Sequence, residues 1–243
     1  AEALGTVLAS VNSKQKFLVV ESYGGDDEPV DMISSSLAQA GLSVSLDPVK
    51  VRDEPTQATY QECEETGTDL GQLLTSKSSL LARKAAMSND VAKALGKVSG
   101  GLYVVTAAQG DSRSAMIASW VAQASFEPLG LTIAVAKDRA IESLMQDGDA
   151  FVLNMLPEDD YGGTMKHFLK RFPPGADRFE GVGFRDAECG SPVLDAASAH
   201  VELRVSDRME TSDHWIVYAE ATGGAVSTPK PTATHRRAVA SYY

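Results

Sequence analysis

The chain has 243 residues, 43% of them hydrophobic and 23% charged, which is enough apolar material for one large domain or two smaller ones. Its 22 Lys and Arg residues against 33 Asp and Glu residues give a net charge of −11, which excludes a protein that binds nucleic acid through a broad positive surface. No stretch approaches the roughly 18 consecutive apolar residues of a membrane span, so we expect no span and no nucleic-acid partner.

The two cysteines, Cys63 and Cys189, lie far apart in the sequence and form no metal-binding or redox motif. We therefore expect no disulfide framework and a reducing compartment. The sequence begins at Ala1 rather than Met, without the basic and apolar segments typical of a signal peptide, so we expect a processed, truncated or excised chain.

Charge divides the chain into three parts, which we take as its domain organisation. Residues 1–76 carry a net charge of −9, residues 77–98 one of +4, and residues 99–243 one of −6. The middle part is rich in small residues and lacks proline and aromatic residues. It is therefore predicted to be a linker with one or two helical turns between two domains.

The first part alternates strand-like and helix-like segments. The run Phe-Leu-Val-Val at 17–20 is typical of a buried parallel strand, and residues 42–51 predict a second strand. Between them an apolar stripe predicts a helix that ends at Gly41, and residues 57–75 predict a second helix. This order indicates a parallel sheet, but two strands are too few for a doubly wound one, so we expect half of an α/β domain. We expect a partner chain, exchange with a second copy, or packing on the rest of the chain to stabilise it.

From residue 99 the pattern changes to short segments rich in β-branched residues. Two interrupting helices are expected, at Arg139–Asp147 and Gly163–Arg171. Many strands with few helices indicate a closed antiparallel barrel, which leaves no exposed sheet edge. The segments that predict strands are 101–110, 130–137, 150–156, 199–210 and 214–227.

Residues 115–139, AMIASWVAQASFEPLGLTIAVAKDR, contain Met, Ser, an aromatic residue and Ser-Phe-x-Pro before a strand that ends in basic residues. This run resembles the flavin-binding segment of the flavin reductase-like split-barrel family. Residues 189–205 and 212–224 are similar to later strands of the same family, and the three segments occur in the family's order. The resemblance implies a mainly β, FMN-binding split barrel over residues 99–243.

Residues 17–74 resemble the C-terminal half of the flavodoxin-like domain in flavodiiron proteins. Such a half followed by a flavin reductase-like module is similar to the carboxyl end of photosynthetic-type flavodiiron proteins, which occur in cyanobacteria and in chloroplasts of algae and lower plants. The resemblance implies a location in the cyanobacterial cytoplasm or the chloroplast stroma. It also implies electron delivery from NAD(P)H or ferredoxin through FMN to a diiron centre that reduces oxygen.

The chain departs from the flavodiiron pattern at the metal. A diiron centre needs a cluster of His and carboxylate ligands, whereas four His residues occur here, none at ligand spacing. We therefore expect no metal in this chain. The diiron domain and the amino-terminal half of the flavodoxin-like domain are expected as missing parts of the parent protein, and thus as partners.

An FMN site needs an apolar wall for the ring, polar groups at the ring edge, and a cation for the phosphate. The residues to which the resemblance assigns these roles are Met116, Ile117, Ala118, Ser119, Gln123, Ser125, Lys137, Arg139 and His214. The first four would contact the ring through the backbone, while Ser119, Ser125 and Gln123 would add side-chain hydrogen bonds. Lys137 and Arg139 would hold the phosphate, because they follow a strand shortly before a helix start. His214 would lie near flavin or nicotinamide.

Several residues of these segments also have simpler roles. Trp120 and Phe126 could wall the ring, but we expect both in the core, where aromatic side chains are common. His214 could equally be a hydrogen-bonded turn residue. Lys166 and His167 could guide a dinucleotide, but a solvated helix face is the expected role.

The reaction implied is hydride transfer from nicotinamide to flavin, which requires no acid, base or nucleophile from the chain, so no catalytic residue is assigned. The leading interpretation is an electron-transfer module of a flavodiiron oxygen reductase, working as a homodimer or heterodimer. Two alternatives stay open: a non-catalytic FMN-binding or oligomerisation barrel, and a free-standing flavin reductase that releases reduced flavin.

Overall fold

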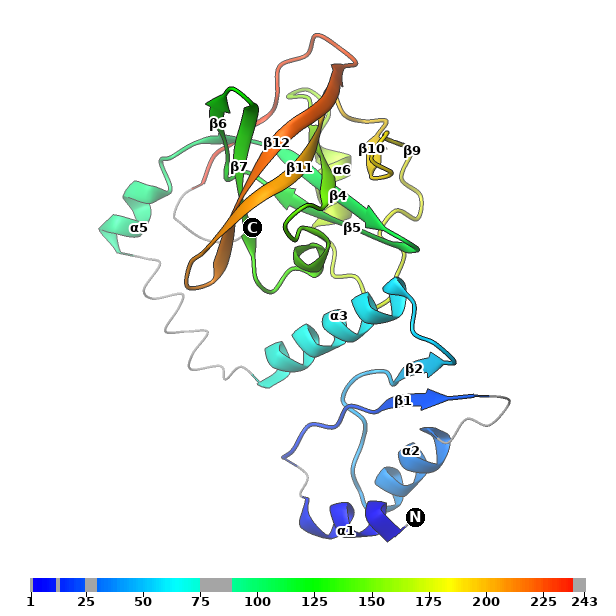
Figure 1. The fold of residues 1–243 in the computed structure, drawn as a ribbon. Helices are drawn as coiled ribbons and strands as arrows, with labels where there is room; N and C mark the ends of the chain where they lie inside the picture. The colour runs from blue at the N-terminus through cyan, green and yellow to red at the C-terminus, as the bar shows by residue number, and fades with distance from the viewer. Residues whose placement is uncertain (1, 12–13, 25–29, 75–88, 238–243) are drawn as a thin grey trace.

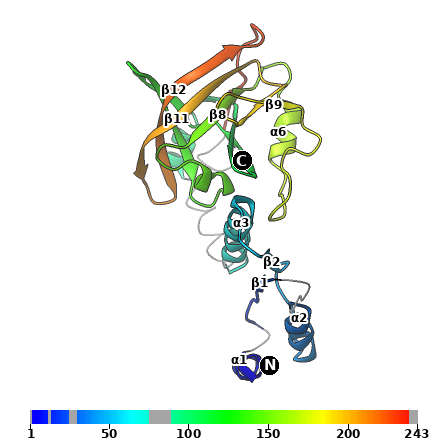
Figure 2. The same ribbon diagram turned by 45° about the vertical axis from the view of Figure 1, so that its right-hand side comes forward.

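The computed structural model describes residues 2–11, 14–24, 30–74 and 89–237. They form a large β-rich body, made by the last of these ranges, and a small α/β unit at the amino end (Figure 1). Helix α3 (Gln57–Leu74) lies between the two, against the large body (Figure 2).

The large body consists mostly of strands. In chain order its elements are α5 (Asp90–Leu95), β3 (Gly100–Gly101), β4 (Tyr103–Gln109), β5 (Ser112–Ala118), β6 (Val121–Phe126), β7 (Leu129–Ala136), the 3-10 helix η1 (Ala140–Leu144), β8 (Ala150–Met155), α6 (Gly162–Phe168), β9 (Phe184–Asp186), β10 (Pro192–Leu194), β11 (Ala199–Glu210), β12 (His214–Val226) and β13 (Thr234–His235). The five predicted strands are confirmed as β4, β7, β8, β11 and β12. The two predicted helices are present as η1 and α6, each shorter than expected.

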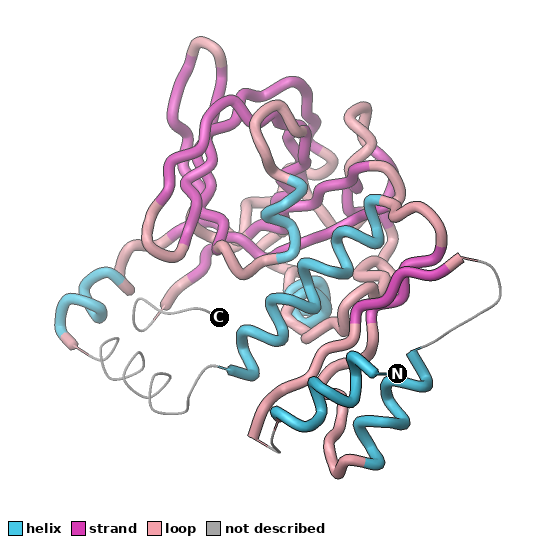
Figure 3. The backbone as a smooth tube through the Cα atoms, turned by 60° about the horizontal axis from the view of Figure 1, so that its bottom comes forward, coloured by secondary structure: helices cyan, strands magenta, loops and turns pink. Residues whose placement is uncertain are grey.

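Seven strands form one antiparallel sheet in the order β5-β4-β8-β11-β12-β7-β6. The outer strands β5 and β6 follow each other in the chain with only Ser119 and Trp120 between them, so the sheet curls until its edges meet at this turn (Figure 3). Within the described ranges, β5 and β6 are not paired with each other. The barrel is therefore split rather than hydrogen-bonded all round, and the expectation of a closed barrel is corrected in that respect.

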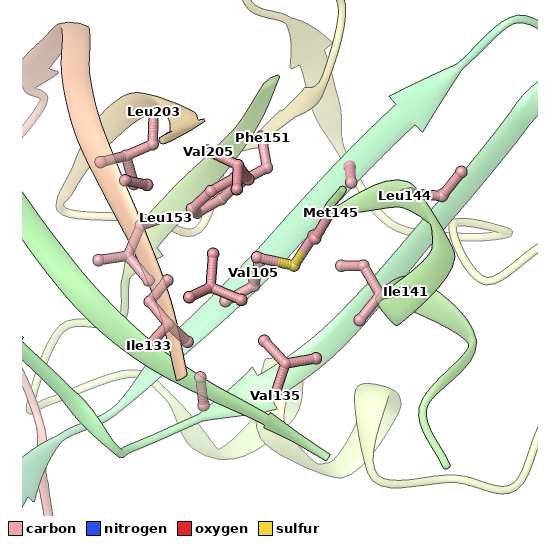
Figure 4. Close-up of a cluster of buried hydrophobic side chains, with 14 of the residues drawn as sticks. Val105, Ile133, Val135, Ile141, Leu144, Met145, Phe151, Leu153, Leu203 and Val205 are labelled. Carbon is pink, nitrogen blue, oxygen red and sulfur yellow. The ribbon is translucent and has the colours of Figure 1, made fainter. Parts of the chain in front are cut away.

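The main hydrophobic core fills the inside of this sheet (Figure 4). Alternate residues of the strands point inward, as the period of two requires, and η1 adds Ile141 and Leu144 to the cluster. A fully buried aliphatic or aromatic side chain contributes about 1.5–3 kcal/mol, so this core dominates the stability of the large body. Strand residues that are fully buried here include Val105, Ile133, Phe151, Leu153 and Leu203.

The outer face of the sheet is covered by α6 and the loops that follow it, which bury a second apolar cluster around Leu156 and Phe179. A buried amide holds this cover in place. Asn154 donates from Nδ2 to Thr106 Oγ1 at 3.1 Å and accepts at Oδ1 from the Leu194 N–H at 2.8 Å. Strand β10 is thus fixed to the sheet by a satisfied buried polar group.

The small unit consists of α1 (Glu2–Ser10), β1 (Val20–Tyr23), α2 (Val30–Gln39) and β2 (Val49–Arg52). The parallel pairing of β1 with β2 is as predicted, although both strands begin later than the sequence indicates. Gly41 stops helix α2, as predicted: it lies two residues after the last helical residue and adopts φ +74°, which lets the Leu42 N–H reach the Leu37 carbonyl at 2.9 Å. The core of this unit is small and centres on Val19 and Leu37.

Helix α3 spans the predicted range almost to the residue and is tied to the large body by polar contacts. Its amino end receives Asp111, whose Oδ1 accepts the Ala58 N–H at 2.9 Å. In its middle, Gln61 Nε2 donates to the Ala140 carbonyl at 2.6 Å. This helix, predicted as part of the first domain, therefore packs on the second.

Two ion pairs complete the attachment of α3. Glu65 accepts from Arg178 Nη2 at 2.7 Å and from the Gly175 N–H at 3.0 Å, and Asp69 pairs with Arg171 at 2.8 Å. Gly175 has φ +73°, a conformation that other residues rarely adopt, so glycine at this position lets the loop present its N–H to Glu65. The side chains of Arg178 and Glu65 are only 16% and 9% exposed, so this pair is largely shielded from solvent.

The predicted linker, residues 77–98, lies partly outside the described residues. Its last part forms α5, whose amino end is capped by Asn89, with Oδ1 accepting the Ala92 N–H at 2.8 Å. The division into residues 1–76, 77–98 and 99–243 stays a prediction. In the ranges that the structure describes, no helix is long and apolar enough to cross a bilayer, no group of His, Cys, Asp and Glu side chains could hold a metal ion, and both cysteines are free thiols.

Candidate functional site

A small cavity lies where the curled sheet brings its two outer strands together, at the β5–β6 turn. We call it the ring cavity because the rings of Trp120 and His214 form one side of it. It encloses about 60 Å³. Its lining residues are Met116, Ile117, Ala118, Ser119, Trp120, Ala134, Ala136, Arg139, His214 and Arg237.

The ring cavity gathers six of the residues predicted for FMN. Met116 to Ser119 come from the end of β5, and the turn that follows is held to β7 because the Trp120 carbonyl accepts the Ala134 N–H at 3.0 Å. Arg139 follows β7, and His214 begins β12. Residues almost 100 positions apart thus meet because β12 pairs with β7.

His214 is held from two directions. Its Nδ1 lies 2.9 Å from Asp213 Oδ1, and its ring centroid lies 5.0 Å from that of Trp120 with the planes tilted by 40°. Thr211 accepts the His214 N–H at Oγ1 and donates the same hydroxyl to the His214 carbonyl. The imidazole is therefore both a hydrogen-bonded turn residue, as one interpretation predicted, and part of the cavity wall.

Two guanidinium groups reach the ring cavity in a chain that is acidic overall. Arg139 is about half-exposed and lies 3.9 Å from Asp138, and Arg237 lies with its guanidinium carbon 5.0 Å from the Trp120 ring centroid. Guanidinium groups bind phosphate and carboxylate through paired hydrogen bonds, so this end of the cavity suits an anionic group.

Ser125 and Gln123 are not among the residues that line the ring cavity. The Ser125 hydroxyl lies 2.8 Å from the Tyr218 hydroxyl and donates to the Pro128 carbonyl at 2.6 Å, which is a structural role. A Cβ on Gly130 would lie 2.7 Å from Ser125 Oγ, so glycine leaves room for these contacts. Gln123 is exposed on the outer strand β6, and its amide donates to the Ser125 carbonyl at 3.4 Å.

Lys137 is also separated from the ring cavity. Its Nζ pairs with Glu210 Oε1 at 2.6 Å and lies 5.4 Å from the centroid of the Trp215 ring, on the side of the sheet where the β11–β12 hairpin ends. A cation already held by a carboxylate is a weaker candidate for a phosphate ligand than Arg139. The structure thus favours Arg139 over Lys137 as a candidate phosphate ligand, although the sequence alone gives both residues the same role.

Two expectations about aromatic residues are wrong. Trp120 is 43% exposed and Phe126 is 84% exposed, so neither is a core residue. The reason is that Trp120 lies in the turn between the two outer strands and Phe126 ends the outer strand β6 at the β6–β7 hairpin. The solvated role expected for His167 is also wrong, because its Nε2 contacts the Arg178 carbonyl at 2.8 Å, whereas Lys166 is exposed as expected.

Sequence reasoning missed Arg237, Ala134 and Ala136 as cavity residues. The two alanines alternate along β7, so their common face could be inferred from the strand period. Arg237 has no such signal. It reaches the cavity because β13 pairs with β3, which brings the carboxyl-terminal segment back beside the start of the large body.

The sequence profile of the family described as "Flavin reductase like domain" matches residues 95–242. The chain belongs to this family, which agrees with the β-rich fold of the large body. As the sequence predicted, it is a flavin-dependent oxidoreductase by family.

The chain is similar over nearly its whole length to cyanobacterial diflavin flavoproteins. Diflavin flavoprotein A 1 of Synechocystis sp. is 54% identical over 240 residues, which cover 98% of this chain and 42% of that protein. The chain spans less than half the length of the curated relatives it matches. These likenesses confirm the predicted resemblance to a part of a flavodiiron-type protein.

Solved structures show the same fold in the large body. The NADH:FAD oxidoreductase SgcE6 of Streptomyces globisporus superimposes with a TM-score of 0.55 at 25% identity, covering 60% of this chain and 86% of that one. BorF, the flavin reductase component of a bacterial two-component tryptophan halogenase, superimposes with a TM-score of 0.54 at 22% identity, over 60% of this chain and 91% of its own.

Proposed function

We propose that this chain is an FMN-dependent electron-transfer module that accepts electrons from NAD(P)H or ferredoxin and serves an oxygen-reducing flavodiiron enzyme in the cyanobacterial cytoplasm. The observation that carries the proposal is the ring cavity, where two aromatic rings and two guanidinium groups meet at the edge of a flavin reductase-like sheet. The cyanobacterial relatives support the setting.

The residues of the ring cavity are of the kinds that a flavin site needs, and its volume of about 60 Å³ admits part of the flavin ring. Trp120 and Ala134 offer an apolar surface, the Ser119 hydroxyl and the backbone of residues 116–119 offer hydrogen bonds, and Arg139 offers a cation for the phosphate. Bound FMN would supply a hydride acceptor, which side chains alone cannot. The chain's own residues would orient the ring, keep water from one face, and hold the phosphate.

Two further parts of the proposal concern the assembly. Residues 1–76 are proposed to be the C-terminal half of a flavodoxin-like domain, which the parallel β1–α2–β2 order followed by α3 supports. The module is proposed to act as a dimer and together with a diiron domain of a longer protein. The length of the relatives, of which this chain covers 42%, supports the second point.

The proposal is tested with FMN and riboflavin, which differ only in the phosphate. Arg139→Ala should weaken FMN binding by about tenfold or more, because a charge-assisted contact contributes about 1.5–3 kcal/mol. Riboflavin binding should not change. Lys137→Ala is the matched control, because it removes a cation two residues away that already pairs with Glu210. The dissociation constants of this variant for FMN and for riboflavin should equal those of the wild type.

Anaerobic addition of NADPH to the FMN-loaded protein provides the second measurement. Bleaching of the flavin absorbance supports a reductase, and flavin colour without bleaching would favour ferredoxin as donor or a non-catalytic binding barrel. A wild-type chain that binds no flavin, or an equal loss of FMN and riboflavin in Arg139→Ala, would contradict the proposed site.

A further inference from the structure

A second, larger cleft lies between α3 and the large body. It encloses about 370 Å³, which is within the usual range for a small-molecule site. One wall is α3, with Thr68 and Gln72, and the other comes from β5, η1 and the segment after α6. We call it the α3 cleft. It shares Met116, Ile117 and Arg139 with the ring cavity, so the two spaces lie next to each other.

The α3 cleft is richer in cations than the rest of the protein. Four basic residues line it against three acidic ones, in a chain whose net charge is −11. Two of the four, Arg171 and Arg178, hold α3 through Asp69 and Glu65. The other two differ: Arg139 has a carboxylate only at 3.9 Å, and the Lys170 ammonium lies 3.5 Å from His167 Nδ1.

The four basic residues of the α3 cleft thus fall into two groups, one that holds α3 in place and one that can bind a ligand. The two ion pairs fix the position of α3 and use two of the cations in doing so. Arg139 and Lys170 lie on the same cleft and are exposed enough to accept a ligand. A phosphoryl group is the chemistry that guanidinium and ammonium groups lining one cleft favour, because it accepts several charge-assisted hydrogen bonds at once.

We propose that the α3 cleft binds a phosphoryl-bearing part of a ligand whose ring lies in the ring cavity or beside it, with α3 as a required wall. The inference rests on the proposed function for the source of that group, which is either FMN or a nicotinamide dinucleotide. Helix α3 lies outside residues 95–242, the part that matches the flavin reductase family. Binding would therefore depend on a segment that the family profile does not include.

The test adds one negative charge to the α3 wall without altering the large body. Gln72→Glu places a carboxylate on the cleft, while Gln39→Glu makes the same change on α2, away from the cleft, and serves as the matched control. Lys170→Gln removes a cation from the opposite wall. The ligands titrated are inorganic pyrophosphate, FMN, riboflavin and NADP⁺, with dissociation constants measured by calorimetry.

Gln72→Glu and Lys170→Gln should each weaken pyrophosphate binding by about three- to tenfold at low salt, since a charge several ångströms away in a partly solvated cleft has an effect of this size. Gln39→Glu should bind as the wild type does. If both cleft variants also lose affinity for FMN but not for riboflavin, the flavin phosphate is the group bound in the cleft. If they lose affinity for NADP⁺, the dinucleotide is the ligand.

Equal affinities of Gln72→Glu and Gln39→Glu for pyrophosphate, FMN and NADP⁺ would overturn the inference. The outcome is independent of the proposed function. A chain that binds no flavin, but whose pyrophosphate affinity falls in both cleft variants, retains the α3 cleft as a phosphoryl site while the FMN proposal fails.

Discussion

The seven-stranded sheet and the parallel two-stranded sheet of this protein differ in how completely each encloses a core. The seven-stranded sheet surrounds fully buried side chains such as Ile133 and Phe151 on its inner face and is covered on its outer face. The parallel two-stranded sheet packs on a small cluster centred on Val19, just before β1, and Leu37 of α2, and Val20 of β1 is 58% exposed. The alternation of inward and outward side chains thus builds a large core in the seven-stranded body and only a small one in the amino-terminal unit.

The comparison shows that packing, rather than secondary-structure pattern, decides which part of a chain is stable on its own. Helix α3 belongs to the small unit by sequence order, yet its polar contacts reach the large body. The expectation that the first part packs on the rest of the chain is met by this helix. Variants that weaken the contacts of α3 therefore test how far the stability of the small unit depends on the large body.

The largest effect is expected from Phe151→Ala, which removes a fully buried side chain from the large body. It should lower the free energy of unfolding by about 3–5 kcal/mol. The chain has two tryptophans, Trp120 and Trp215, and both lie in the large body, so their fluorescence during urea unfolding reports on that part.

Leu37→Ala is the companion variant in the small unit. It should shift the tryptophan transition by no more than about 0.5 kcal/mol while reducing amide protection in residues 30–52. If Leu37→Ala shifts the fluorescence transition as far as Phe151→Ala does, the two parts unfold as one cooperative unit and the comparison fails.

An intermediate effect is expected from Glu65→Gln, which leaves Arg178 without its charged partner in a largely buried place. The attachment of α3 should weaken by about 1–3 kcal/mol, seen as faster hydrogen exchange over residues 57–74. Asp90→Asn is the control, because it breaks an exposed pair with Lys93 that should be worth no more than about 0.5 kcal/mol. Equal exchange rates in the two variants would show that the buried pair does not hold α3.

The smallest effect concerns pH at the amino end of α3. The pKa of Asp111 is lowered from its usual 3.8, first by the hydrogen bond from the Ala58 N–H and then by the Thr56 hydroxyl. A carboxyl with a lowered pKa stabilises the fold above its unfolded pKa, and this contribution is lost as the pH falls through the folded value. The protection factor of the Ala58 amide, which is its exchange rate relative to the intrinsic rate at the same pH, should fall below about pH 4 in the wild type.

Asp111→Asn should remove that pH dependence, since an amide does not titrate. Unchanged acid sensitivity of the Ala58 amide in this variant would assign the effect to another group.

The sequence predicted the longer elements well and missed the small-residue strands. Helix α3 and the β-branched strands have strong periodic patterns. Strands β5 and β6, Ser-Arg-Ser-Ala-Met-Ile-Ala and Val-Ala-Gln-Ala-Ser-Phe, are rich in Ala and Ser, which have little strand preference of their own. Pairing with β4 and β7 makes them strands, and such pairing depends on tertiary structure.

The candidate site shows the same limit at the level of single residues. The order of motifs led to Met116, Ser119, Arg139 and His214, which line one cavity. It could not separate Arg139 from Lys137, because the carboxylate that holds Lys137 lies 73 positions away. Such distinctions depend on long-range contacts that no local pattern contains.

The position of α3 also has a consequence for recombination between related chains. A junction at residue 95, where the family match begins, would separate Glu65 and Asp69 from the arginines that hold them. The barrel from one chain would then pack on an α3 helix whose side chains evolved to fit the barrel of another chain. Exchanges that preserve a working module should therefore place the junction before residue 57, so that helix and barrel are inherited together.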